Sequence, residues 1–201
     1  MASELVKLTE YGYGQLELNL VAFPRTGRVV AQYKAGNTFI GASREEDIPV
    51  ENGMLLKVDG VNRCVDMAAP AVGNVYALNY STEHMYDERT YRLADYKLNP
   101  VDDFYPRLGY LDIGDKFTTN TVCIEAEVAE GASKKDKAAA AKAAIEAAMK
   151  TGVVFGGAGA DGYIKLNTTA DEFIAGPLLR VVELYTMTDG QPAVKLEVIR
   201  A

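Results

Sequence analysis

The single histidine, His84, is the first residue that could do chemistry, because imidazole is the base of most hydrolytic triads and dyads. The nearby sequence supplies a hydroxyl nucleophile and carboxylates, at Ser81, Glu83, Asp87 and Glu88. Closeness in sequence does not create the geometry of a triad, and no G-x-S-x-G nucleophile elbow occurs. We therefore expect His84 to be a surface or capping histidine, and the sequence predicts no catalytic residue.

The second candidate is the glycine-rich run Gly157-Ala158-Gly159-Ala160-Asp161-Gly162, which has the GxGxxG spacing of dinucleotide-binding loops. In those folds a helix begins directly after the glycines, and its N-terminus holds the pyrophosphate. Here the strand-like run Tyr163-Ile164-Lys165-Leu166 follows, and the helical pattern precedes the glycines. The run is therefore predicted to be a flexible glycine-alanine loop, and we expect no cofactor.

Acidic residues form the third candidate, at Glu45-Glu46-Asp47, at Asp102-Asp103, and at Asp112 and Asp115. Paired carboxylates can hydrolyse glycosides or bind calcium. The calcium-loop pattern D-x-[DN]-x-[DN]-G is absent, however, and the chain has no Trp of the kind that lines sugar clefts. These acids are interpreted as solvated turns.

Two cysteines, Cys64 and Cys123, stand far apart in the sequence and outside any CxxC pair or histidine cluster. The sequence therefore predicts no metal site. We expect both residues to be reduced thiols that act as small apolar core residues, with one disulfide between them as the alternative. Taken together, the four candidates favour a protein that is not an enzyme.

Composition narrows the class of partner. The chain has 201 residues, of which 48% are hydrophobic and 24% charged, so it is long enough to bury a sizeable core. Its net charge of −7 opposes the clustered Lys and Arg that phosphate contacts need. We expect neither nucleic acid nor membrane as a partner. No long apolar segment and no signal-peptide pattern is visible, which favours a protein made in the cytoplasm.

Short alternating runs separated by turn signals dominate the chain. Residues 16–20 alternate with a period of two, which predicts a half-buried strand. Asp59-Gly60 predicts a hairpin between residues 54–58 and 61–67, and Asp189-Gly190 predicts one between residues 178–185 and 193–199. We therefore expect a mainly β fold, an antiparallel barrel or sandwich.

One α-helix interrupts this β pattern near residues 133–151. Ser133 and Asp136 have the spacing of a capping box, the segment from Ala138 to Lys150 is alanine-rich, and Gly152 is placed to end the helix. The apolar stripe is thin, so we expect an inserted helix on the surface, or one that packs on a neighbouring subunit. The expected organisation is an N-terminal arm and hairpin over residues 1–50 and a β-rich domain over residues 51–201 that carries the helix.

Three blocks of the chain resemble stretches of small virion proteins of tailed bacteriophages. The first is residues 73–89, GNVYALNYSTEHMYDER; the second is residues 114–120, GDKFTTN; the third is the closing region, PLLRVVE at residues 177–183 and DGQPAVKLEV at residues 189–198. The resemblance covers about residues 50–201. The N-terminal region and the alanine-rich helix match no part of it.

The resemblance implies a capsid decoration (cement) protein. Such proteins are β-rich and often oligomeric, and they bind across capsomer boundaries on the outside of the shell to resist the internal DNA pressure. The implied partners are the major capsid protein and further copies of the chain, and the implied location is the virion, assembled in the host cytoplasm. The resemblance brings no catalytic residue with it.

A cement protein needs contact area at shallow interfaces, and an extended arm supplies it. We expect Tyr11, Tyr13, Leu16, Leu18 and Leu20 to form such a partner interface by adding a strand to a neighbour. Loss of binding after deletion of residues 1–22 would support this arm. The alternative function is a β-barrel module that binds a small molecule or a glycan.

Overall fold

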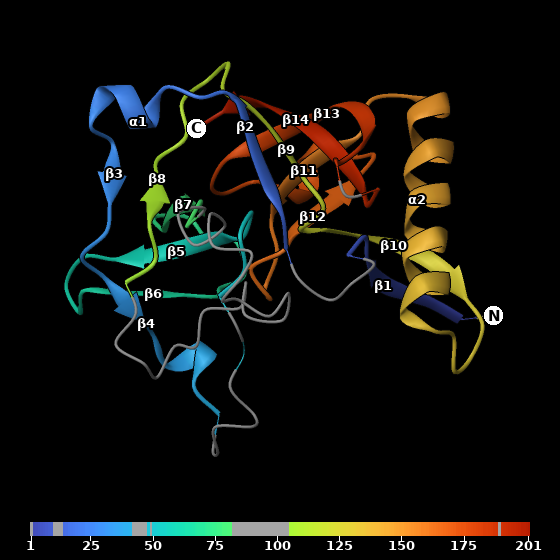
Figure 1. The fold of residues 1–201 in the computed structure, drawn as a ribbon, viewed down its shortest axis with the longest axis horizontal. Coiled ribbons are helices and arrows are strands. Elements are labelled where there is room, and N and C mark those ends of the chain that lie inside the picture. The colour runs from blue at the N-terminus through green and yellow to red at the C-terminus, as the bar shows by residue number, and fades with distance from the viewer. Residues whose placement is uncertain (1, 10–13, 42–47, 49, 82–104, 189) are drawn as a thin grey trace.

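The computed structural model describes residues 2–9, 14–41, 48, 50–81, 105–188 and 190–201. Two curled sheets and one long helix make up this part of the chain (Figure 1). The prediction of a mainly β fold with a single alanine-rich helix is therefore confirmed. Both sheets are mixed, because each contains one parallel pair, β10 with β12 and β4 with β6.

The first sheet has eight strands, and its two edges are formed by the first two strands of the chain. In spatial order the strands are β1 (Ala2–Lys7), β10 (Val122–Val128), β12 (Ile164–Asn167), β11 (Phe155–Ala158), β13 (Leu178–Thr186), β14 (Pro192–Arg200), β9 (Lys116–Thr119) and β2 (Leu16–Leu20). The predicted closing hairpin is present as β13 and β14.

The second sheet has six shorter strands. In spatial order they are β3 (Val29–Val30), β8 (Leu108–Gly109), β7 (Val75–Asn79), β5 (Leu55–Asp59), β6 (Cys64–Asp66) and β4 (Lys34–Ala35). The hairpin predicted at Asp59-Gly60 joins β5 to β6, and the Asp59 carboxylate accepts hydrogen bonds from the backbone N–H groups of Val61 and Asn62 at 2.9 Å. These bonds hold the turn closed.

Among the described residues, short helical turns connect the strands at α1 (Phe23–Thr26), η1 (Asn37–Phe39) and η5 (Ala170–Glu172). After α1 the chain forms the short strand β3, which pairs with β8. Within α1, the ring of Phe23 is fully buried and contacts Tyr80, with ring centroids 4.8 Å apart. Burying this ring fixes the path of the chain between the sheets.

The two sheets share one hydrophobic core. Leu55 and Leu78 of the six-stranded sheet belong to the same buried cluster as Phe117 and Leu196 of the eight-stranded sheet. A second cluster joins Met54 and Leu56 to Cys123 and Tyr163. Residues 1–50 supply strands to both sheets. The domain boundary near residue 50 stays a prediction.

The helix α2 (Lys134–Thr151) lies against the eight-stranded sheet, beside β10 and β1 (Figure 1). The capping box is present as predicted: the backbone N–H of Asp136 bonds to Ser133 Oγ, and that of Ser133 to the Asp136 carboxylate, both at 3.2 Å. Ala138, Ala141 and Ile145 are buried. A narrow stripe of buried residues therefore holds the helix against the sheet, and the opposite face of the helix is exposed.

The glycine-alanine run differs in part from the prediction of a loop: Gly157 and Ala158 belong to a strand, and residues 159–162 form a turn. Gly156 and Gly157 lie inside β11, which pairs with β12 on one side and β13 on the other. A Cβ at Gly157 would lie 2.5 Å from Cδ1 of Phe173, so the buried ring occupies the space that a side chain would need. Glycine is present here because an aromatic ring packs directly on the backbone.

Candidate functional site

The predicted partner interface lies on β2, at one edge of the eight-stranded sheet. Leu16 is buried in the core, Leu18 is half-buried against it, and Leu20 is 62% exposed. Tyr11 and Tyr13 lie outside the described residues. The strand pairs with β9 of its own chain, and its backbone register shifts between Leu18 and Leu20. This bulge turns Leu20 out of the alternation that the sequence suggested.

The described part of residues 1–22 is built into the domain. Val6 and Leu8 are 2% and 0% exposed, and both belong to the main core cluster with Leu16. Deleting residues 1–22 would therefore open the core as well as remove an interface. Point substitutions on the outer side of β2 are the suitable test of the interface.

A buried polar seam holds the beginning of β2 in place. Thr119 donates a hydrogen bond from Oγ1 to the carbonyl oxygen of Gln15 at 2.5 Å, and the backbone N–H of Gln15 bonds to Asn120 Oδ1 at 2.6 Å. Thr121 donates to the carbonyl oxygen of Asn52 at 2.5 Å. Thr119, Asn120 and Thr121 are fully buried, so these bonds satisfy groups that water cannot reach. The seam therefore fixes the residue before β2 to the end of β9, and the Thr121 bond joins the same region to the segment before β5.

An exposed apolar corner adjoins the end of β2. Leu20 pairs with Lys116 at the beginning of β9, and Ile113, in the turn just before β9, is 72% exposed. Asp115 shapes this turn, because its carboxylate accepts from the backbone N–H groups of Ala22 and Asp112, both at 2.9 Å. Asp112 and Asp115 therefore lie in a turn, as interpreted from the sequence, but Asp115 is 5% exposed, so its carboxylate is bound by backbone groups and is not solvated.

The other candidates for chemistry are placed as follows. His84, Glu45 to Asp47, and Asp102 with Asp103 lie outside the described residues. Both cysteines are free thiols, as expected. Burial and the neighbouring Asp66 raise the pKa of Cys64, and burial above all raises the pKa of Cys123 to about 12. Raised pKa values leave both thiols protonated at neutral pH, which makes them poor nucleophiles.

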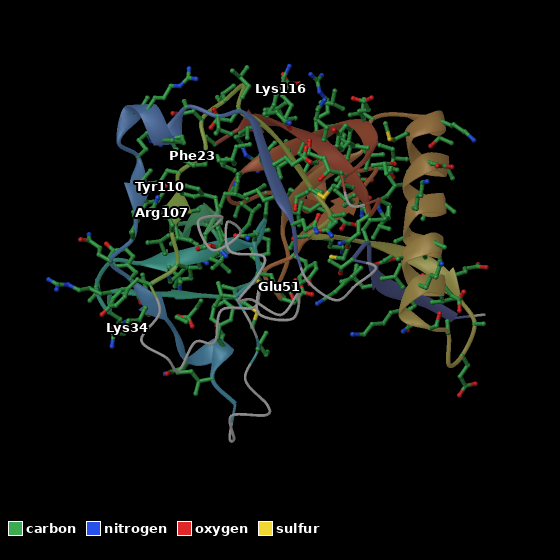
Figure 2. All side chains as sticks on the ribbon, in the orientation of Figure 1. Phe23, Lys34, Glu51, Arg107, Tyr110 and Lys116 are labelled. Carbon is green, nitrogen blue, oxygen red and sulfur yellow. The ribbon has the colours of Figure 1, made fainter. Side chains whose placement is uncertain are left out.

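One buried pair was not foreseen from the sequence. Tyr163, at the start of β12, donates a hydrogen bond from its hydroxyl to Glu51 Oε2 at 2.6 Å. Figure 2 shows Glu51 near the middle of the view, below the region where the sheets meet. The residues are 112 positions apart, and no local pattern marks a buried glutamate, so only the tertiary structure could bring them together.

Within the described part of the chain, no group of three or more His, Cys, Asp or Glu side chains is arranged to hold a metal ion. None of the described helices is long and apolar enough to cross a membrane. Comparison with models of known families, with curated proteins and with solved structures finds no match for this chain.

Proposed function

We propose that this chain is a structural protein of a tailed-bacteriophage virion that binds the outside of the capsid and stabilises it by bridging capsomers, without catalysis. Its partners are the major capsid protein and further copies of itself, and nucleic acid and membrane are not among them. It acts in the virion after assembly in the host cytoplasm. The proposal rests on the resemblance of residues 50–201 to small virion proteins and on the surface of β2.

The observation that carries the proposal is the exposed Leu20 on an open sheet edge. No strand among the described residues pairs with the outer side of β2. An edge strand that exposes an apolar side chain is a template for pairing with another chain. Behind this edge, one buried hydrophobic cluster contains residues of both sheets, which gives the domain the stability that a capsid-surface protein needs. A partner strand on β2 would bury Leu20 and Ile113 together.

The first experiment counts the chain in density-purified particles from the source lysate by quantitative mass spectrometry, relative to the most abundant shell protein. A stable ratio near one, or near a simple fraction, is expected for a stoichiometric capsid component. If the chain stays entirely in the soluble fraction, the virion proposal is wrong.

The second experiment tests the β2 surface with Leu20→Glu. The purified variant is added to particles that lack the chain, and the bound fraction is measured by co-sedimentation. Loss of a buried leucine contact costs about 2 kcal/mol, so affinity should fall at least about tenfold. The matched control is Val61→Glu, at the tip of the β5–β6 hairpin, where the side chain is 92% exposed. Equal binding by the two variants would exclude β2 as the capsid contact.

The alternative, a β module that binds a small molecule or a glycan, stays a prediction. A saturable rise in the melting temperature on addition of a ligand would support it, because a ligand that binds only the folded state stabilises that state.

A further inference from the structure

The second open edge of the eight-stranded sheet, β1, has backbone groups in position to receive another strand. The backbone N–H of Leu8 bonds to the carbonyl oxygen of Val122 at 3.0 Å, and β1 pairs with β10 in antiparallel register. Hydrogen-bonded and non-hydrogen-bonded pairs alternate along such a ladder. Ser3, Leu5 and Lys7 therefore direct their N–H and C=O groups away from β10, and none of these groups has a hydrogen-bond partner among the described residues.

A groove of about 360 Å³ follows this edge. It is lined by Lys134 and Lys137 of α2 on one side of β1 and by Tyr163 on the other, with Leu5 and Lys7 of the strand between them. Because residues from both sides of β1 line the same space, the groove runs along the strand edge. Figure 1 shows β1 beside the N-terminal turns of α2, which form the helical wall.

The exposed charges of the lining are cationic, although the whole chain carries a net charge of −7. Lys137 pairs with Glu4 at 2.6 Å and Lys7 pairs with Asp161 at 3.4 Å, in partly exposed ion pairs that another carboxylate can replace. Lys134 is exposed and has no ion pair within the described residues. The helical wall therefore attracts acidic side chains.

The far wall is built around the ring of Tyr163, which is held by buried contacts. The Tyr163 ring is buried, its hydroxyl donates to Glu51, and the Lys7 ammonium lies 3.6 Å from the ring centroid. Glu51 is the one acidic residue known to line the groove, and it is buried and bonded to Tyr163. The wall is thus preorganised, which lowers the entropy cost of binding.

We propose that this groove binds an extended acidic peptide segment of a partner protein, which adds a strand to β1. The backbone of the segment would bond to the outward groups of Ser3, Leu5 and Lys7. Its side chains would alternate, with acidic residues toward Lys134 and Lys137 and apolar residues toward Leu5 and Tyr163. Strand addition takes its affinity from the backbone and its specificity from alternate side chains. The inference does not depend on the capsid proposal.

Charge decides between this occupant and a second copy of the chain. Two β1 edges paired with each other would bring Lys7, Lys134 and Lys137 of both copies close together. Like charges across an interface are unfavourable, whereas the acidic side chains of the proposed segment complement Lys134 and Lys137. The observations therefore favour a partner segment that is acidic.

The test uses two fluorescein-labelled octapeptides with blocked ends, one of alternating Glu and Val and the other of alternating Lys and Val. Fluorescence anisotropy measures their binding to the full chain at low and at high salt. The Glu–Val peptide should bind at least about tenfold more tightly than the Lys–Val peptide, and added salt should weaken its binding because the exposed charges are screened. Equal binding of the two peptides would overturn the proposal.

Two variants locate the site. Leu5→Pro removes an outward N–H without breaking a bond to β10, so it should abolish binding of the Glu–Val peptide while the circular dichroism spectrum stays unchanged. Lys134→Glu should weaken binding about tenfold, and an acidic residue at the helix N-terminus does not harm α2. The matched control, Lys142→Glu on another part of α2, should bind as the wild type does.

Three results would overturn the assignment. The first is unchanged binding by Lys134→Glu. The second is unchanged binding by a folded Leu5→Pro variant. The third is a wild-type chain that sediments as a dimer, becomes a monomer with Leu5→Pro, and does not bind the Glu–Val peptide, because a second copy would then occupy the edge.

Discussion

The hydroxyl of Tyr163 lies 2.6 Å from the carboxylate of Glu51, and the two residues are only 3% and 5% exposed. Burial, and then the charge of Glu51, raise the pKa of Tyr163 above its ordinary value. The phenol therefore stays protonated at neutral pH and donates its hydrogen bond, which offsets part of the free-energy cost of burying a carboxylate. This pair joins the strand region of β12 to the turn before β5.

Tyr163→Phe should lower the free energy of unfolding by about 2 kcal/mol, because it leaves the buried Glu51 without this donor. Urea unfolding followed by circular dichroism measures the change. Tyr110→Phe is the matched control, since the Tyr110 hydroxyl makes no hydrogen bond within the described residues. A loss no larger than that of the control would show that the Tyr163–Glu51 bond contributes nothing to stability.

The buried thiol of Cys123 should make stability depend on pH in the alkaline range. Burial raises its pKa from 9.0 to about 12, so the folded protein keeps the proton after the unfolded chain has lost it. The stabilising contribution is complete below pH 9.0, and it decreases as the pH rises from there toward 12. The slope for one such group is about 1.4 kcal/mol per pH unit.

Urea unfolding of the wild type and of Cys123→Ala, with reductant present, measures this contribution. The difference in unfolding free energy between them should shrink by about 1.4 kcal/mol between about pH 8 and about pH 10. Groups common to both proteins cancel in this difference. A difference that is constant with pH would show that the thiol ionises equally in the folded and unfolded states.

Gly157→Ala should destabilise the protein by about 1–3 kcal/mol, because the new Cβ would overlap the buried ring of Phe173. Gly152→Ala is the control: Gly152 has an extended φ of 172°, and no atom lies within 4 Å of an added Cβ. Thermal unfolding compares the two variants. If both variants melt at the wild-type temperature, the packing of the Phe173 ring does not require a glycine at position 157.

The sequence by itself determined the local features of this protein. Ser133 and Asp136 predicted the beginning of α2, because a capping box needs residues only three positions apart. Asp59 and Gly60 predicted the β5–β6 turn for the same reason. The interpretation of the glycine run as a loop was wrong for Gly157 and Ala158, which lie in β11, where Phe173 packs on Gly157 from elsewhere in the chain.

Only the tertiary structure decided which strands became edges and what surrounds them. β1 and β2 follow each other in the sequence but lie at opposite edges of one sheet, and α2 lies beside the first. The groove along β1 combines Lys7, Lys134 and Tyr163, which no short-range pattern relates. The physical reason is that hydrophobic burial, which selects the strand order, is non-directional and acts between residues far apart in the sequence.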